Sequence, residues 1–274
     1  MSKTTAIAWT DSSWNPWIGC TRRSDACTHC YAESMNKMRK WNGGTWGPGT
    51  PRRITAESGW RQPAKWNEAA ALGARGKDGH HWLVFAGDLC DIFDDEGPVD
   101  ARERMWELFR ATPQLTWQVL TKRPENFSRF LPTDWGPKGY ANVWLGVTVE
   151  NCVEAHRRID ILRQTPAKLR FVSFEPLLEE LPDLDLTGIQ WAIVGGESGG
   201  EARPFDISWG RSIHAQCAKS ETTFFFKQLG RKPVQGGVQF PLRFRKKDDK
   251  RDSNGTLVRN FPEDLRIQCW PSYS

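Results

Sequence analysis

The fold of this chain is decided by residues 82–121, which read WLVFAGDLCDIFDDEGPVDARERMWELFRATPQLTWQVLT. The stretch opens with an apolar run over residues 82–87 and closes with another over residues 115–121, and both are typical of strands buried on two faces. Between them, residues 99–111 carry apolar side chains at helical spacing. A strand, a helix and a second strand in this order predict a parallel pair joined by a right-handed crossover.

The alternation of strand and helix extends outward from this stretch through most of the 274 residues. Further strands are predicted over residues 6–9, 143–149, 169–174, 189–194 and 222–227. Further helices are predicted over residues 31–41, 152–164 and 207–220. Residues 42–65 are rich in Gly, Pro and Arg and predict a long ordered loop. Six or seven such units predict an α/β fold, a partial (β/α)6–7 TIM-like barrel over residues 1–230, with a basic C-terminal extension over residues 231–274 packed on or beside it.

The composition narrows the class of protein. A net charge of +5 permits a nucleic-acid partner without requiring one. Fifteen Trp against three Tyr is unusual, and we expect most of these side chains in the core. No apolar run approaches the roughly 18 residues of a membrane span, and no signal peptide opens the chain, so we expect a cytoplasmic protein without a membrane partner.

Three of the seven cysteines, Cys20, Cys27 and Cys30, lie within eleven residues. In a reducing compartment such a cluster favours metal binding over disulfides. Three thiolates on a [4Fe–4S] cluster would leave one iron open for a cofactor. The alternative from spacing alone is a zinc site completed by one of His29, His80, His81 or Cys90. Because a core of this size needs no metal staple, the position between a strand and a helix favours the cluster.

Polar residues follow the predicted strands at their carboxyl ends, where α/β proteins place their sites. Glu150 and Glu175 end strands and can hold ribose hydroxyls or substrate, or serve as helix caps and ion pairs. The turn Gly195-Gly196-Glu197-Ser198-Gly199-Gly200 lacks the phosphate-loop pattern and is expected to line the cofactor or its adenine. The cations at the same edge can grip the phosphates of a nucleic acid or remain solvated; they are Lys122, Arg123 and Lys227.

Several segments, taken in order, resemble a known family. The first are Trp9-Thr10-Asp11, Trp14-Asn15-Pro16, Gly19-Cys20-Thr21, Cys27 and Cys30-Tyr31-Ala32-Glu33. The later ones are residues 171–178 (FVSFEPLL), 194–199 (VGGESG) and 225–228 (FFKQ). From about residue 9 to residue 230 the chain resembles a phage-associated three-Cys-motif family related to radical S-adenosylmethionine (SAM) enzymes and to the spore photoproduct lyase type. It departs from the usual radical SAM motif in having six rather than three residues between the first two cysteines.

The resemblance implies a barrel of the radical SAM type that holds a [4Fe–4S] cluster on Cys20, Cys27 and Cys30. It implies SAM as cofactor, a 5′-deoxyadenosyl radical that abstracts a substrate hydrogen, and an electron donor such as flavodoxin or ferredoxin. Gly87 and Asp88 correspond to the loop that meets the amino group of SAM, although a tight turn with a helix-capping Asp88 is the simpler alternative. The cofactor-binding group is then Tyr31, Gly87, Asp88, Glu150, Glu175, Gly195, Gly196 and Glu197.

Some relatives of this kind are linked to thymidine hypermodification in phage DNA, which serves restriction evasion. We therefore expect a DNA-modifying isomerase that moves glycine on a thymine methyl from nitrogen to carbon linkage in the host cytoplasm. The alternatives are a thymine-adduct lyase, a non-enzymatic zinc-bound nucleic-acid-binding module, and a metal-dependent hydrolase that uses Asp88, Asp91, Glu150 and Glu175. The basic runs 243–247 and 250–251 can track a DNA backbone or form a solvated tail.

Overall fold

The computed structural model describes residues 5–77, 79, 81–242 and 255–272. The chain divides into two compact units. The first comprises residues 1–23, 30–147 and 164–169, and the second comprises residues 24–29, 148–163 and 170–274. His80 and the basic runs 243–247 and 250–251, which entered the sequence-based hypotheses, lie outside the described residues.

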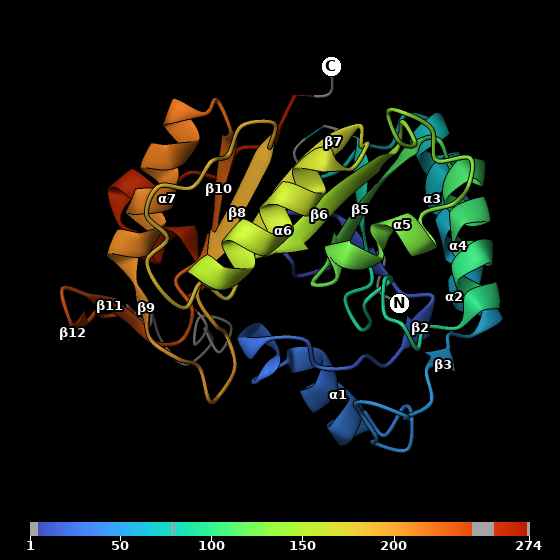
Figure 1. The fold of residues 1–274 in the computed structure, drawn as a ribbon, viewed down its shortest axis with the longest axis horizontal. Coiled ribbons are helices and arrows are strands. Elements are labelled where there is room, and N and C mark those ends of the chain that lie inside the picture. The colour runs from blue at the N-terminus through green and yellow to red at the C-terminus, as the bar shows by residue number, and fades with distance from the viewer. Residues whose placement is uncertain (1–4, 78, 80, 243–254, 273–274) are drawn as a thin grey trace. The chain divides into compact units, whose positions relative to one another are not determined.

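Four parallel strands, in the order β1-β4-β5-β6, form the sheet of the first unit. Their bounds are Ser12–Trp14 (β1), Trp82–Ala86 (β4), Leu115–Thr121 (β5) and Val143–Thr148 (β6). Figure 1 labels β5 and β6 of this sheet. Val84 of β4 pairs with Ser12 on one side and with Trp117 on the other. The predicted unit of strand, helix and strand is confirmed, with helix α4 (Val99–Ala111) between β4 and β5.

Helix α4 forms because its apolar residues recur on one face. Ala101, Met105 and Phe109 are buried at four-residue spacing. The first unit also contains α1 (Tyr31–Arg39), α2 (Glu57–Trp60), α3 (Gln62–Ala71), the 3-10 helix η2 (Pro124–Asn126) and α5 (Phe127–Phe130). A small antiparallel pair joins β2 (Trp17–Ile18) to β3 (Arg53–Ile54).

Tryptophan fills the core, as expected from the composition. Ten of the fifteen Trp side chains are buried. In the first unit, the Trp14 ring meets Trp60 edge-on at 4.9 Å and Trp117 at 5.5 Å between centroids. Phe109 of α4 stacks on Trp117 at 4.1 Å, which fastens the helix to the sheet.

The second unit is built on the parallel strands β7, β8 and β10. Their bounds are Leu169–Phe174 (β7), Trp191–Gly195 (β8) and Thr223–Gln228 (β10), and the long helices are α6 (Cys152–Gln164) and α7 (Ile207–Lys219). A small sheet orders β12 (Val238–Gln239), β11 (Pro233–Gln235) and β9 (Phe205–Asp206). Among its described residues, the unit also contains the 3-10 helices η1 (Asp25–Cys27), η4 (Val258–Asn260) and η5 (Glu263–Leu265).

The described end of the C-terminal extension packs within the second unit. Phe261 and Leu265 are buried, and the Phe261 ring lies 4.9 Å from that of Phe226. The backbone N–H of Phe226 donates to the carbonyl of Ile267 at 2.8 Å. The extension therefore adds an apolar layer to β10.

Two sequence-based predictions of elements are wrong. Residues 6–9 form no strand, because the ladder with β4 begins at Asp11, whose N–H donates to the Leu83 carbonyl at 3.1 Å. The 6–9 run is apolar because it packs, with the Trp9 ring 4.7 Å from Phe85. Residues 42–65 contain helical turns as well as loop, since Trp60 and Trp66 are buried on α2 and α3.

Parallel strands that alternate with helices make this an α/β protein, which confirms the predicted class. None of the helices in the described ranges has the length and apolar character needed to cross a bilayer.

Candidate functional site

The cysteine loop, residues 19–30, is fastened to the segment that follows β4. Gly19 forms an isolated parallel bridge with Cys90, and its N–H donates to the Leu89 carbonyl at 3.1 Å. Gly19 has a φ of +122°, a backbone conformation that a side chain would strain. At the other end of the loop, the Tyr31 hydroxyl donates to the Asp88 carbonyl at 2.5 Å. Both ends of the loop are thus held at the carboxyl end of β4.

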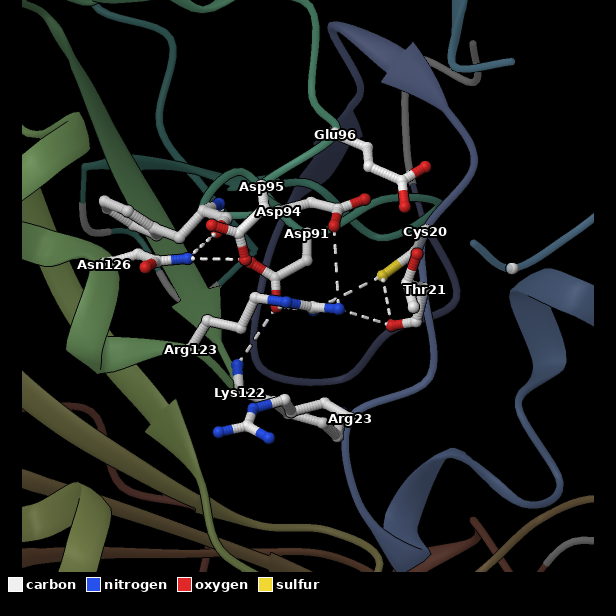
Figure 2. A network of polar contacts seen from close by, with 12 residues as sticks. Cys20, Thr21, Arg23, Asp91, Asp94, Asp95, Glu96, Lys122, Arg123 and Asn126 are labelled. Atoms are coloured by element: carbon white, nitrogen blue, oxygen red, sulfur yellow. Dashed lines mark hydrogen bonds and ion pairs between the residues drawn. The ribbon is translucent and has the colours of Figure 1, made fainter. Parts of the chain in front are cut away.

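Arg123, just beyond β5, reaches the first cysteine of this loop. Its Nη1 lies 3.7 Å from the Cys20 sulfur, and its Nη2 donates to the Thr21 carbonyl at 2.6 Å. Figure 2 shows the guanidinium between the cysteine loop and Asp91. Arg123 is only 4% exposed, so bulk water screens the interaction between its positive charge and Cys20 only weakly.

Two carboxylates compensate this buried cation. Arg123 lies 3.2 Å from Asp91 and 3.6 Å from Asp94. Burial alone would lower the pKa of Arg123, but Asp91, then Cys20 and Asp94, outweigh burial and raise it. Asp94 is shared with the buried Arg52 at 2.8 Å, and the Thr121 hydroxyl donates to Asp91 at 2.7 Å. The ion pairs with Asp91 and Asp94 therefore hold the positive charge of Arg123 in a fixed position (Figure 2).

The predicted cofactor residues Gly87 and Asp88 lie beside the anchored loop. Gly87 has a φ of +94°, and a Cβ there would meet the Cys90 carbonyl at 3.3 Å, so the turn requires glycine. The Asn15 side-chain amide donates to the Asp88 carboxylate. Burial raises the pKa of Asp88, against hydrogen bonds from Asn15 and Ser13 that lower it. The helix-cap alternative for Asp88 is wrong, because the next helix, α4, begins only at Val99.

The middle of the cysteine loop, residues 24–29, belongs to the second unit. Glu197 accepts from Arg203 at 2.7 Å and contacts His29 Nδ1 at 3.1 Å. Arg203 also donates to the Asp25 carbonyl at 3.0 Å. Burial alone would raise the pKa of Glu197, but the bonds from Arg203 and His29 lower it. Glu197, predicted to bind a cofactor, thus anchors the segment that carries Cys27.

Glu150, predicted to hold ribose or substrate, is wholly buried in the second unit. Its Oε2 pairs with Arg158 Nη1 at 2.8 Å, and the same nitrogen donates to the Thr148 carbonyl at 2.7 Å. Glu154, one turn before Arg158 on α6, pairs with it at 2.8 Å. Of the roles that the sequence leaves open for Glu150, this geometry is that of an ion pair.

The remaining predicted residues of the second unit lie at the ends of β7, β8 and β10. Lys227 and Gln228 both donate to Oε1 of Glu175. A Cβ on Gly196 would lie 2.5 Å from the Leu229 carbonyl oxygen, and one on Gly195 would lie 3.1 Å from Gln228. Close packing therefore accounts for both glycines.

The three predicted phosphate-binding cations differ in their surroundings. Arg123 and Lys227 are ion-paired within their own units. Lys122 is half-buried, and its backbone N–H donates to Asp91 at 3.2 Å. Of these three cations, Arg123 also contacts the sulfur of Cys20.

The cysteines are possible metal ligands, but their side chains are not already grouped as a metal site in the described residues. All seven lie in the described ranges, and none of them forms a disulfide. Cys20, Cys27 and Cys30 are each partly exposed. Among the described residues, no three His, Cys, Asp or Glu side chains are grouped so as to hold a metal ion. The three thiols fit a [4Fe–4S] cluster in donor type, and cluster assembly requires them to converge.

The sequence analysis did not indicate several residues of these networks, among them Arg52, Asp94 and Arg203. Asp94 stands three residues after Asp91 in a loop already expected at the site, which was a usable signal. Arg52 is far in sequence from Asp94, and Arg203 is far from Asp25 although close to Glu197, and no local pattern indicates the two distant contacts.

Comparisons with curated proteins and with solved structures gave no match. The sequence model of the family described as "Protein of unknown function (DUF5131)" matches residues 4–262, and the chain belongs to that family.

Proposed function

We propose that this chain is a radical SAM enzyme that modifies a nucleic-acid base, with Cys20, Cys27 and Cys30 as the ligands of a [4Fe–4S] cluster. The proposed reaction is the isomerisation of glycine-modified thymidine from nitrogen to carbon linkage in phage DNA, in the host cytoplasm. The observation that carries the proposal is the anchoring of Cys20 at the carboxyl end of β4, next to Arg123. The proposal implies that the parallel strands are those of a partial barrel of the radical SAM type.

When bound, the cluster and SAM would supply the hydrogen-abstracting carbon radical, with the electron coming from a donor such as flavodoxin or ferredoxin. The chain's own residues bind and orient. Arg123 places a buried positive charge and an N–H donor at the sulfur of Cys20. The side chains of Asn15 and Tyr31 hold the segment Gly87-Asp88, which the family resemblance assigns to the amino group of SAM.

A glycine-type substrate suits this chemistry. Removal of a hydrogen from an α-carbon leaves a radical that the adjacent nitrogen and carbonyl stabilise. The protein then has to hold the modified base and exclude water, which is how proteins contribute to cofactor-driven reactions.

Metal content tests the cluster. After anaerobic reconstitution with iron and sulfide, we expect about four iron and four sulfide per chain and a charge-transfer absorption in the visible range. Cys20→Ala, Cys27→Ala and Cys30→Ala should each lose most of the iron. Cys269→Ala, which removes an exposed cysteine, is the matched control and should keep it. About one zinc per chain without iron–sulfur absorption would overturn the radical proposal in favour of the zinc-bound module.

Product analysis tests the reaction. The reduced, reconstituted chain is incubated with SAM and an oligonucleotide that carries glycine on the thymine methyl through nitrogen. We expect a product nucleoside of unchanged mass and altered chromatographic mobility, formed only when the three cysteines are present. Appearance of 5′-deoxyadenosine with an unchanged base would overturn the isomerase, and release of unmodified thymine would indicate the lyase instead.

A further inference from the structure

The end of helix α1 and the segment after it form a strongly basic part of the first unit. From Ser34 to Ala56 the sequence contains five Lys and Arg residues and no Asp or Glu. Four of the five are exposed, namely Lys37, Arg39, Lys40 and Arg53. Three carboxylates from outside the segment contact it: Glu33 pairs with Lys37 at 2.8 Å, and Asp94 and Glu96 lie 2.8 and 3.3 Å from Arg52. The excess of positive charge on this surface therefore remains.

Two tryptophans lie within this charged segment. Trp41 and Trp46 are half-buried, unlike the ten tryptophans of the core. The guanidinium of Arg39 lies over the Trp41 ring at 5.6 Å. An aromatic face beside cations is the arrangement that proteins use to stack the bases of single-stranded nucleic acid.

The segment has a defined backbone. The Asn36 amide donates to the Thr45 carbonyl at 2.7 Å, and the buried Arg52 donates to the carbonyls of Gly47 at 3.0 Å and Thr50 at 2.7 Å. Arg52 is itself held by Asp94 at 2.8 Å. The cations and the rings are thus presented from a fixed frame.

This frame is joined to the cysteine loop. The Gly47 N–H donates to the Cys20 carbonyl at 3.2 Å, and Arg52 Nη2 donates to the Thr21 hydroxyl at 2.6 Å. A ligand held on the segment would therefore lie in the same unit as Cys20 and Arg123, next to the anchored end of the loop.

We infer that the basic–tryptophan surface, formed by Lys37, Arg39, Lys40, Trp41, Trp46 and Arg53, binds a single strand of DNA. Lys37, Arg39, Lys40 and Arg53 contact phosphates, and Trp41 stacks on a base. The choice of DNA among polyanions rests on the proposed function, whereas the binding itself rests on charge and aromatic exposure. The assignment also supplies phosphate contacts that the ion-paired Arg123 and Lys227 do not offer.

Fluorescence anisotropy with a labelled single-stranded oligonucleotide tests the surface on the full chain, as purified and after reconstitution. In Lys37→Gln/Arg39→Gln/Lys40→Gln we expect affinity to fall roughly tenfold or more, and the slope of log K against log salt to shrink by about two. Lys65→Gln/Lys138→Gln/Lys219→Gln removes the same charge from exposed positions elsewhere and should bind like the wild type. Equal loss in both triple variants, or no binding by the wild type, would overturn the inference.

The stacking step has its own test. Trp41→Ala should weaken binding by roughly tenfold, and Trp41→Phe should restore most of it, because any aromatic face stacks on a base. Inorganic polyphosphate, which has no bases, is the competitor. If it displaces DNA as well from the wild type as from Trp41→Ala, and Trp41→Ala binds DNA normally, the surface is a general polyanion site and the inference fails.

Iron content measured on the same samples separates the two proposals. If the wild type keeps its iron–sulfur content but does not bind DNA, only the inferred DNA-binding surface is overturned, and the radical mechanism is not. If the chain takes up no iron but binds DNA through the basic–tryptophan surface, only the radical mechanism is overturned.

Discussion

The guanidinium of Arg123 lies against the thiol of Cys20, with Nη1 3.7 Å from Sγ, and Asp91 holds it there. A buried cation that also donates a hydrogen bond stabilises negative charge on the sulfur. Hydrogen bonds to the sulfurs and the net charge nearby are among the factors that set the reduction potential of an iron–sulfur cluster. In the proposed function, Arg123 would therefore tune the potential of the cluster without being one of its ligands.

Removal of this cation should lower the midpoint potential of the reconstituted chain. Asp91→Asn/Arg123→Gln removes the positive charge and the N–H donor while it neutralises the buried partner carboxylate. We expect iron content to be kept and the potential, followed by a redox titration of the electron paramagnetic resonance signal, to become more negative. Asp95→Asn/Arg129→Gln removes an exposed pair at 2.6 Å and is the control. Because the first variant changes no net charge, an unchanged potential would show that the N–H donor of Arg123 does not act on the sulfur of Cys20.

Glycine at position 196 should prove necessary for stability. An added methyl group would meet the Leu229 carbonyl oxygen at 2.5 Å and the Phe205 Cβ at 2.8 Å. Gly196→Ala is therefore expected to lower the free energy of unfolding by about 1–3 kcal/mol, measured by urea denaturation. In the same turn, a Cβ on Gly200 meets nothing within 4 Å, so Gly200→Ala serves as the control. Equal stability of the two variants would contradict the packing account of the turn.

The pair Glu150–Arg158 should behave as a structural ion pair. Both side chains are fully buried, so Arg158→Met leaves a carboxylate without its cation. We expect a loss of about 3–5 kcal/mol in the free energy of unfolding. Arg163→Met on the same helix breaks partly exposed pairs with Asp160 and Asp185 and should lose less stability than Arg158→Met. A loss as small for Arg158→Met would reopen a ligand-binding role for Glu150.

Glu197 should make stability depend on pH in the acid range. Its pKa lies below the ordinary value of 4.5, so near that pH the folded chain binds fewer protons than the unfolded chain. The stabilisation is present above about pH 4.5 and is lost as the pH falls through the folded-state pKa. The stability difference between wild type and Glu197→Gln, from urea denaturation, should therefore be largest near neutral pH and shrink in acid.

The control for this experiment is Glu201→Gln, which changes an exposed carboxylate in the neighbouring loop. Its stability should stay within about 0.5 kcal/mol of the wild type at every pH. A difference for Glu197→Gln that does not vary with pH would show that packing, rather than charge, accounts for its effect.

Sequence patterns predicted the elements whose apolar spacing is strong. The strand at 82–86, helix α4 and the strand at 115–121 have nearly the predicted bounds, because local periodicity and burial agree there. The first strand was misplaced because the 6–9 run is apolar for packing on Phe85, whereas pairing with β4 starts at Asp11. A sequence pattern alone does not show whether an apolar run pairs as a strand or packs as a loop.

The sequence predicts the location of the candidate site but not the hydrogen bonds and ion pairs between its side chains. The order of strands indicated that polar residues would follow their carboxyl ends, and Gly87, Asp88 and Arg123 do. No pattern in the sequence indicates that Asp91 holds Arg123 against Cys20, or that Glu197 anchors the segment carrying Cys27. Such contacts depend on tertiary neighbours.

The hydrogen bonds that Asn36 and Arg52 make to the backbone of residues 45–50 have a kinetic consequence. A binding segment that is already ordered loses little conformational entropy when its ligand arrives, and it needs no folding step after encounter. Association of an oligonucleotide should therefore follow a single exponential whose rate rises linearly with concentration and falls with ionic strength. Loosening the frame through Asn36→Ala should convert this one-step process into one with a second, concentration-independent phase.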